Sequence, residues 1–193
     1  DGIDVQNLTL FCFNDYGLYI THVEAELNPT IEVPSLSGTY KAVIPDDTRI
    51  IHFVANQNPN LYDASTFVNR TEDEIQDGMV GASGMIIYWS RFIFNSNDGF
   101  QHQLAEANNG EGIKLIRNQA KISIENPSND YIDISGFVVA NIHAYGTTAP
   151  YHPEKRFPTD GTDFVWPGDD FVTLPNNRTK LSNITDVYSR MEE

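Results

Sequence analysis

The chain has 193 residues, with 27 acidic and 12 basic side chains and a formal net charge of −15 at pH 7. Proteins that bind nucleic acids or anionic lipid surfaces use clustered lysine and arginine, so this charge argues against both kinds of partner. Hydrophobic residues make up 40% of the chain, which is enough for a core, and the length suits one domain, or one domain and the start of another.

The first predicted strand covers residues 5–13 and is apolar on both faces after Asn7, as expected of a central strand. It contains Cys12, the single cysteine of the chain. Because no basic residue lies near it in the sequence to lower its pKa, we interpret Cys12 as an apolar core residue. Residues 14–17 (Asn-Asp-Tyr-Gly) then predict a hairpin turn into a strand at residues 18–23.

Later predicted strands are short and rich in β-branched and aromatic residues, which is typical of an antiparallel sandwich or barrel. Residues 39–44 and 49–55 flank a proline turn and predict a second hairpin. Residues 81–84 (Gly-Ala-Ser-Gly) lack the second glycine of a nucleophile elbow, so we predict a loop there, before a strand at residues 85–94. Residues 131–144 alternate most regularly and predict a long strand with one buried face.

One segment follows a helical period instead. Apolar residues recur at helical spacing between residues 61 and 77, and Thr71 with Glu74 fits a capping box, so we predict one helix or two short ones. Carboxylates in the first turn of a helix usually favour the helix dipole and face solvent. We therefore expect solvent contact, rather than a cation site, for four acidic residues: Glu72, Asp73, Glu74 and Asp77.

The composition changes near residue 150, since half of the ten prolines lie in residues 150–185. We predict a compact β body over residues 1–150, followed over residues 151–193 by a proline-rich extended segment or the start of a second β-domain. No apolar run approaches the ~18 residues that a membrane span needs. Asp1 to Asp4 lack the basic and apolar regions of a signal peptide, so if the protein is exported we expect that segment to have been removed.

The sequence gives no catalytic, cofactor-binding or metal-binding motif, and it identifies no ligand-binding residue. Phosphate loops and dinucleotide fingerprints are absent, and the histidines are never three or four residues apart, which argues against a zinc site. We interpret His52 and His143, in predicted strands, as hydrogen-bonded sheet residues. The histidines are at positions 22, 52, 102, 143 and 152.

Two acidic turns near the end of the chain, at residues 160–163 and 168–170, offer oxygen ligands for calcium, but neither has the order of an EF-hand loop. Ordinary turn chemistry is the favoured interpretation. A hydrolase would need two carboxylates about 5 to 9.5 Å apart in a cleft, and we disfavour that function. Its candidate residues would be Asp160, Asp163 and Asp169.

The order of four segments resembles a known family. They are residues 5–17 (VQNLTLFCFNDYG), 40–58 (YKAVIPDDTRIIHFVANQN), 113–126 (IKLIRNQAKISIEN) and 131–146 (YIDISGFVVANIHAYG). The matching positions are Asp15 and Gly17, Pro45 with Ala55 and Asn56, and Arg117 with Ala120 and Lys121. This order and spacing resemble the N-terminal domain of the Bacteroidales fimbrillin family, which comprises pilus subunits and related cell-adhesion lipoproteins.

The resemblance implies a mainly β, Greek-key, transthyretin-like sandwich with one or two short helices inserted. It also implies a non-enzymatic adhesion protein without a cofactor, exported through the periplasm to the outer membrane or fimbrium, with a lipid anchor that is absent from this chain. Its expected partners are other fimbrial subunits, joined by β-strand addition, and a host or bacterial surface protein or glycan.

A carbohydrate-binding surface lipoprotein module is the alternative function. Aromatic side chains gather late in the chain, where they are suited to stacking on a sugar ring or to anchoring a tail on the sandwich. A glycan array probed with the native chain and with a Trp166 variant would distinguish the two functions. Only a carbohydrate-binding module should lose saccharide binding when Trp166 is mutated. The residues concerned are Tyr145, Tyr151, Phe157, Phe164 and Trp166.

Overall fold

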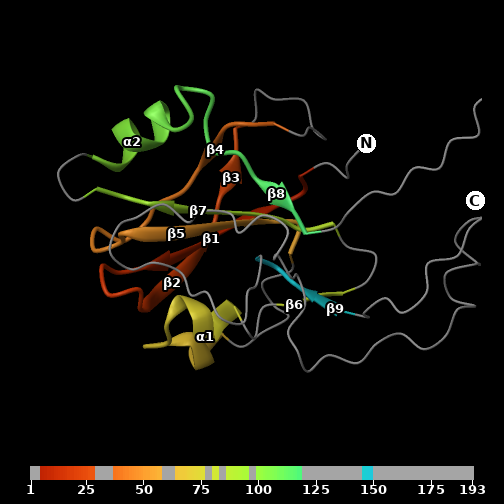
Figure 1. Ribbon diagram of the computed structural model, residues 1–193. Coiled ribbons are helices and arrows are strands. Elements are labelled where there is room, and N and C mark those ends of the chain that lie inside the picture. The colour runs from red at the N-terminus through yellow and green to blue at the C-terminus, as the bar shows by residue number, and fades with distance from the viewer. Residues whose placement is uncertain are drawn as a thin grey trace, which may run out of the picture.

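A computed structural model describes residues 5–28, 37–57, 64–76, 80–82, 86–95, 99–118 and 145–149. These residues form a mainly β structure built from antiparallel pairs (Figure 1). The largest sheet has five strands in the order β2-β1-β5-β7-β8: β1 (Leu8–Phe13), β2 (Tyr19–Glu24), β5 (Ile50–Ala55), β7 (Tyr88–Ile93) and β8 (Ile116–Arg117).

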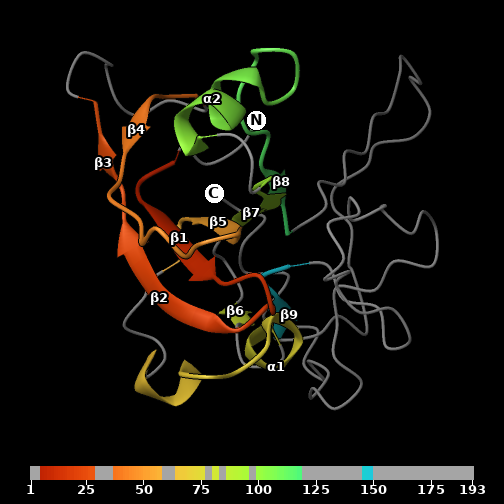
Figure 2. The same ribbon diagram turned by 90° about the vertical axis from the view of Figure 1, so that its left-hand side faces the viewer.

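Two small sheets and three short helical elements complete the described part. The small sheets pair β3 (Glu26–Leu27) with β4 (Tyr40–Lys41), and β6 (Val80–Ala82) with β9 (Tyr145–Thr147). The helical elements are the 3-10 helix η2 (Ala64–Phe67), α1 (Glu72–Gln76) and α2 (Phe100–Glu106). Figure 2 shows β2 curving around β1 toward β3 and β4.

The central strand is β1, which pairs with β2 on one side and with β5 on the other. All six of its side chains are buried, because both faces of the sheet are covered at this strand. Phe11 and Phe13 pack into one cluster, and Leu10 and Cys12 into another. The prediction of a central strand is therefore confirmed, as is Cys12 as a core residue with no exposed surface.

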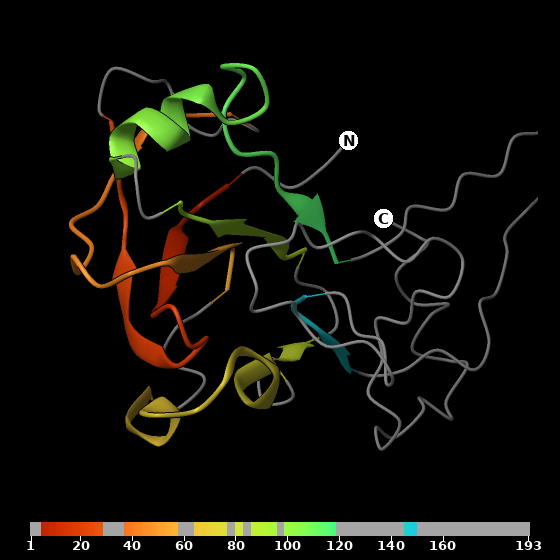
Figure 3. The same cartoon turned by 60° about the vertical axis from the view of Figure 1, so that its left-hand side comes forward.

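The two clusters lie on opposite faces of the sheet, because successive strand residues alternate between them. Figure 3 shows α1 and α2 on opposite sides of the sheet. Phe67 of η2 and Ile75 of α1 pack on the face of Phe11. Phe100 and Leu104 of α2 pack on the face of Leu10, together with Tyr40 of β4. The alternation of the strands thus places apolar side chains into two separate layers.

The hairpin predicted at residues 14–17 is confirmed, since the amide of Asn14 donates to the carbonyl of Leu18 at 2.9 Å. The second predicted hairpin is wrong. A turn does form, because the amide of Thr48 donates to the carbonyl of Pro45 at 3.1 Å, but the flanking strands join different sheets. The reason is that β1 and β7 already occupy both edges of β5, so β4 pairs with β3 instead.

Other predictions near the middle of the chain have mixed outcomes. The helical segment is confirmed as η2 and α1 within residues 64–76, and the strand at residues 85–94 as β7. The loop predicted at residues 81–84 is wrong at its start, because Gly81 and Ala82 belong to β6 and pair with β9. Helix α2 was not predicted. The strand expected at residues 131–144 lies outside the described residues.

Candidate functional site

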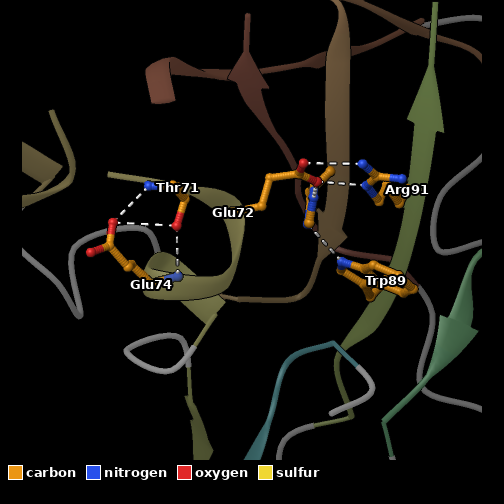
Figure 4. Close-up of polar contacts among 6 residues, drawn as sticks. Thr71, Glu72, Glu74, Trp89 and Arg91 are labelled. Atoms are coloured by element: carbon orange, nitrogen blue, oxygen red, sulfur yellow. Dashed lines mark hydrogen bonds and ion pairs between the residues drawn. The ribbon is translucent and has the colours of Figure 1, made fainter. Parts of the chain in front are cut away.

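A buried polar cluster connects α1 to the five-stranded sheet (Figure 4). Glu72, the first residue of α1, is only 2% exposed. Its carboxylate accepts a hydrogen bond from Nε2 of His52 at 2.7 Å, and two from Arg91, from Nε at 2.5 Å and from Nη2 at 3.0 Å. His52 on β5 and Arg91 on β7 lie opposite each other in the strand register, so one helical carboxylate bridges two neighbouring strands.

The hydrogen bonds of the cluster define the protonation of His52. Nε1 of Trp89 donates to Nδ1 of His52 at 3.1 Å, and an indole N–H can only donate. Nδ1 is therefore the unprotonated nitrogen, and Nε2 carries the proton that is donated to Glu72. Burial lowers the pKa of His52 and outweighs the opposing effect of the Glu72 carboxylate, so the ring is neutral at pH 7.

The environment of Glu72 keeps its carboxylate charged. Burial raises its pKa, but the hydrogen bonds from His52 and Arg91 outweigh this effect and hold the pKa below its usual range. Glu72 was expected to face solvent, and that prediction is wrong. The expectation holds for Glu74, whose side chain is 50% exposed and accepts a hydrogen bond from the amide of Thr71 at 2.9 Å. Asp77 lies outside the described residues.

This cluster is closed to substrates. The side chains of His52, Glu72 and Arg91 are each at most 3% exposed. Cys12 belongs to a separate part of the core, and burial raises its pKa to about 11, so its thiol stays protonated near neutral pH. Across the described segments, no group of three acidic, histidine or cysteine side chains is placed to hold a metal ion. The cluster is therefore interpreted as a structural connection between α1, β5 and β7.

A different feature appears along the outer edge of β7. On its inner edge, β7 pairs with β5 over its whole length, from Tyr88 to Ile93. On its outer edge, β8 pairs only with Tyr88 and Trp89. Within the part of the chain that the structure describes, the strand register on this side therefore ends at Trp89, the second of the six residues of β7.

Two hydrogen bonds show which backbone groups point to the outer edge. The amide of Phe94 donates to the carbonyl of Arg49 on the β5 side at 2.7 Å, and the amide of Asn118 donates to the carbonyl of Ile87 on the β8 side at 2.8 Å. Backbone groups of successive strand residues alternate between the two edges. Ile93 therefore directs its amide and carbonyl outward, beyond the point where β8 ends.

A hollow of about 360 Å³ lies beside this edge, between β7 and the chain that connects α2 to β8. Ser90, Phe92 and Ile93 line it from β7, and Ala107 and Ile113 line it from the connection.

The connection between α2 and β8, which bounds the hollow, begins with a run of left-handed backbone conformations. Four of its residues have positive φ angles, namely Asn108, Asn109, Gly110 and Gly112, which turn the chain sharply after α2. The side-chain amide of Asn108 donates to the carbonyl of Gly112 and closes this turn.

The structure describes some of the histidine, aromatic and acidic residues that the sequence singled out, and others lie outside its described residues. His52 is confirmed as a hydrogen-bonded sheet residue. His22 shares a hydrogen bond of 2.8 Å with the hydroxyl of Tyr19, and His102 is an exposed residue of α2. Tyr145 is placed by its backbone in β9. The following candidates lie outside the described residues: His143, His152, Tyr151, Phe157, Phe164, Trp166, Asp160, Asp163 and Asp169.

The sequence did not reveal the role of Arg91. Its signal was a single arginine inside a predicted apolar strand, because a charged residue in such a position requires a buried partner.

Comparisons with known proteins identify no relative. No family model, no curated protein and no solved structure matches the chain. Within the described residues, none of the helices has the length and apolar character needed to span a membrane.

Proposed function

We propose that the chain is a non-enzymatic cell-surface adhesion protein, a structural subunit of a fimbrium that joins its neighbours by strand addition. The observation that carries the proposal is the outer edge of β7, where the register with β8 ends after Trp89 and a hollow begins. An exposed sheet edge presents backbone donors and acceptors that bind an added strand.

The other edge of the same sheet is less suited to this role. At the start of β2, the amide of Tyr19 donates to the carbonyl of Arg70 at 2.9 Å, and Leu18 forms a bridge with Thr71. The segment before α1 therefore already lies beside the start of β2. This contrast supports strand addition at β7.

The finer assignment rests on the resemblance of the four ordered segments to the fimbrillin family. It includes a Greek-key, transthyretin-like sandwich over residues 1–150 and a linking segment or second β-domain over residues 151–193. It also includes export through the periplasm and a final location at the outer membrane or in the fimbrium. The net charge of −15 supports a surface role, because such a charge favours solubility before assembly and discourages nonspecific edge pairing.

The full-length gene product provides the test. We expect a signal peptide with a lipid-attachment cysteine before Asp1 and a second β-domain after Glu193, and we expect the processed product to form polymers visible by electron microscopy. If the gene encodes neither segment and the product remains monomeric, the proposal is wrong. Saccharide binding on a glycan array that disappears in Trp166→Ala would instead support a carbohydrate-binding module.

A further inference from the structure

We infer that residues 64–76 form a strap across the start of β2, and that a proton on His52 favours release of this strap while the five-stranded sheet stays folded. The strap comprises η2, α1 and the turn between them. It would respond to acid whatever partner the chain has, because it lies beside β2, at the edge of the sheet opposite β8.

Backbone hydrogen bonds join the strap to the hairpin between β1 and β2. The amide of Tyr19 donates to the carbonyl of Arg70 at 2.9 Å, and the amide of Glu72 donates to the carbonyl of Gly17 at 3.2 Å. The strand ladders that join β1 to β2 and to β5 use none of the strap's residues. The strap can therefore open without breaking the ladders of the central strand.

Three buried side chains attach the strap to the face of the sheet. Of the side chains between residues 65 and 75, only Phe67, Glu72 and Ile75 are buried. Phe67 lies edge-on to the ring of Tyr19, with centroids 5.6 Å apart, and Ile75 packs in the same layer. A segment with few buried apolar contacts opens at low free energy. The closed strap therefore depends on the third attachment, in which two strands bind the carboxylate of Glu72.

The hydrogen bonds of His52 fit a neutral imidazole. Its Nδ1 accepts from the indole N–H of Trp89 at 3.1 Å, and its Nε2 donates to Glu72 at 2.7 Å. Both nitrogens of an imidazolium are donors, and an indole N–H cannot accept a hydrogen bond. A proton on Nδ1 would therefore place two N–H groups against each other. Relieving this contact requires the ring to leave its present alignment with Trp89 and Glu72.

The surroundings of the ring determine the direction of the response. Glu72 and Asp73 of α1 favour a positive charge on it, and Arg91 of β7 opposes one. From β1 it meets the uncharged ring of Phe13, with centroids 5.1 Å apart. Burial is the largest effect and lowers the pKa of His52 below 6.5. When the strap opens, water reaches the ring and this effect is lost. The open state therefore binds a proton more readily than the closed state, so acid favours opening.

Amide hydrogen exchange, measured by NMR on the 193-residue chain, compares the strap with the sheet. The amides of Tyr19 and Glu72 report on the strap, because their hydrogen bonds join it to the hairpin, and the amides of β1 report on the sheet. At pH 5.5 we expect the strap amides to be about 100-fold less protected than those of β1. Their exchange should not depend on low concentrations of urea, since local opening exposes little surface. Equal protection would mean that strap and sheet open together, which overturns the inference.

The same amides should respond to pH. A proton taken up at a pKa near 6.5 in the open state raises the opening equilibrium about tenfold between pH 7.5 and pH 5.5. After correction for the intrinsic pH dependence of exchange, the protection of Tyr19 and Glu72 should fall by about that factor. Protection that stays constant over this range contradicts release by acid, and the measurement requires no substitution in the protein.

A pair of histidine variants assigns the response to one ring. His52→Gln removes the buried imidazole, whereas His102→Gln removes one on α2 whose side chain is 61% exposed. We expect the response of the strap amides to pH to disappear in His52→Gln and to persist in His102→Gln. If both variants keep the response, or both lose it, the proton on His52 is not its cause and the inference is wrong.

Nitrogen-15 NMR of the imidazole in the native chain provides a test that does not depend on how His52→Gln folds. In the closed state at pH 5.5 we expect His52 to keep a protonated Nε2 and an unprotonated Nδ1, as its hydrogen bonds require. A closed state that holds a doubly protonated ring at this pH would show that the proton is accommodated without release, and it would overturn the inference.

Discussion

The cluster beneath α1 and the outer edge of β7 share the same strand, and even Arg91, but they differ in which groups of the chain make their contacts. The cluster is rich in charge, yet Glu72, His52 and Arg91 lie buried and bonded to one another. At the edge, the backbone of Ile93 lies beside a hollow that both apolar and polar side chains line, Arg91 of the cluster among them. The difference teaches that the charged side chains of the cluster hold elements of the fold together, whereas the proposed strand addition depends on the backbone at the outer edge of β7.

The largest effect should come from breaking the cluster. Glu72→Gln leaves the guanidinium of Arg91 buried without its counter-charge, so we expect a loss of about 3 to 5 kcal/mol in the free energy of unfolding. Urea denaturation measures it. Glu74→Gln is the matched control from the same helical turn, and it should change stability far less because Glu74 is exposed. Equal effects of the two substitutions would show that the cluster does not hold α1.

Acid should weaken the same cluster in two steps. Burial lowers the pKa of His52 from 6.5, so the unfolded chain takes up a proton there before the folded chain does, and stability falls as the pH drops below about 6.5. The pKa of Glu72 is lowered from 4.5, so a further loss begins below about 4.5. Each group contributes at most about 1.4 kcal/mol per pH unit.

Urea titrations between pH 8 and about pH 3 measure these two steps. His52→Gln should flatten the upper step, because glutamine does not titrate, and it should leave the lower step in place. Stability that is constant between pH 7.5 and pH 5 in the native chain would contradict a neutral, buried His52.

A smaller effect is expected at the start of α1. The hydroxyl of Thr71 accepts a hydrogen bond from the amide of Glu74 at 3.4 Å. Thr71→Ala removes this cap and should cost about 1 kcal/mol. Thermal unfolding can compare it with Thr71→Ser, which keeps the hydroxyl and should retain most of the stability. A serine variant as unstable as the alanine variant would argue that the methyl group, rather than the cap, matters.

The smallest effect should occur beside the hollow. Lys114 is 67% exposed and forms an ion pair with Glu111 on the surface. Exposed ion pairs contribute little, so Lys114→Ala should change the free energy of unfolding by less than about 0.5 kcal/mol. A loss comparable to that of Glu72→Gln would mean that the connection between α2 and β8 is part of the stabilising core.

Local pattern was sufficient to predict β1, its hairpin and the capping box of α1. Each of these depends on neighbours within a few residues, such as Thr71 and Glu74. Helix α2 was missed because it contributes only Phe100 and Leu104 to the apolar layer and starts at Gly99 without a side-chain cap. Its remaining residues give no helical period.

The site depends on contacts that no local pattern contains. Glu72 meets His52 and Arg91 across 20 and 19 residues of sequence, and its helical position alone predicted exposure. The false hairpin at residues 39–55 has a similar cause, since competition between strands for the edges of β5 decided the pairing. The hollow is defined by where β8 stops pairing, which leaves no motif in the sequence.

Because Trp89 donates a hydrogen bond to His52, tryptophan fluorescence should report the protonation of this buried histidine. The chain has two tryptophans, so Trp166→Phe would leave Trp89 as the only indole fluorophore. A neutral imidazole accepts its N–H at 3.1 Å, whereas an imidazolium has no lone pair to accept it and quenches indole emission. The emission of that variant would therefore follow, in real time, the proton on a single buried ring.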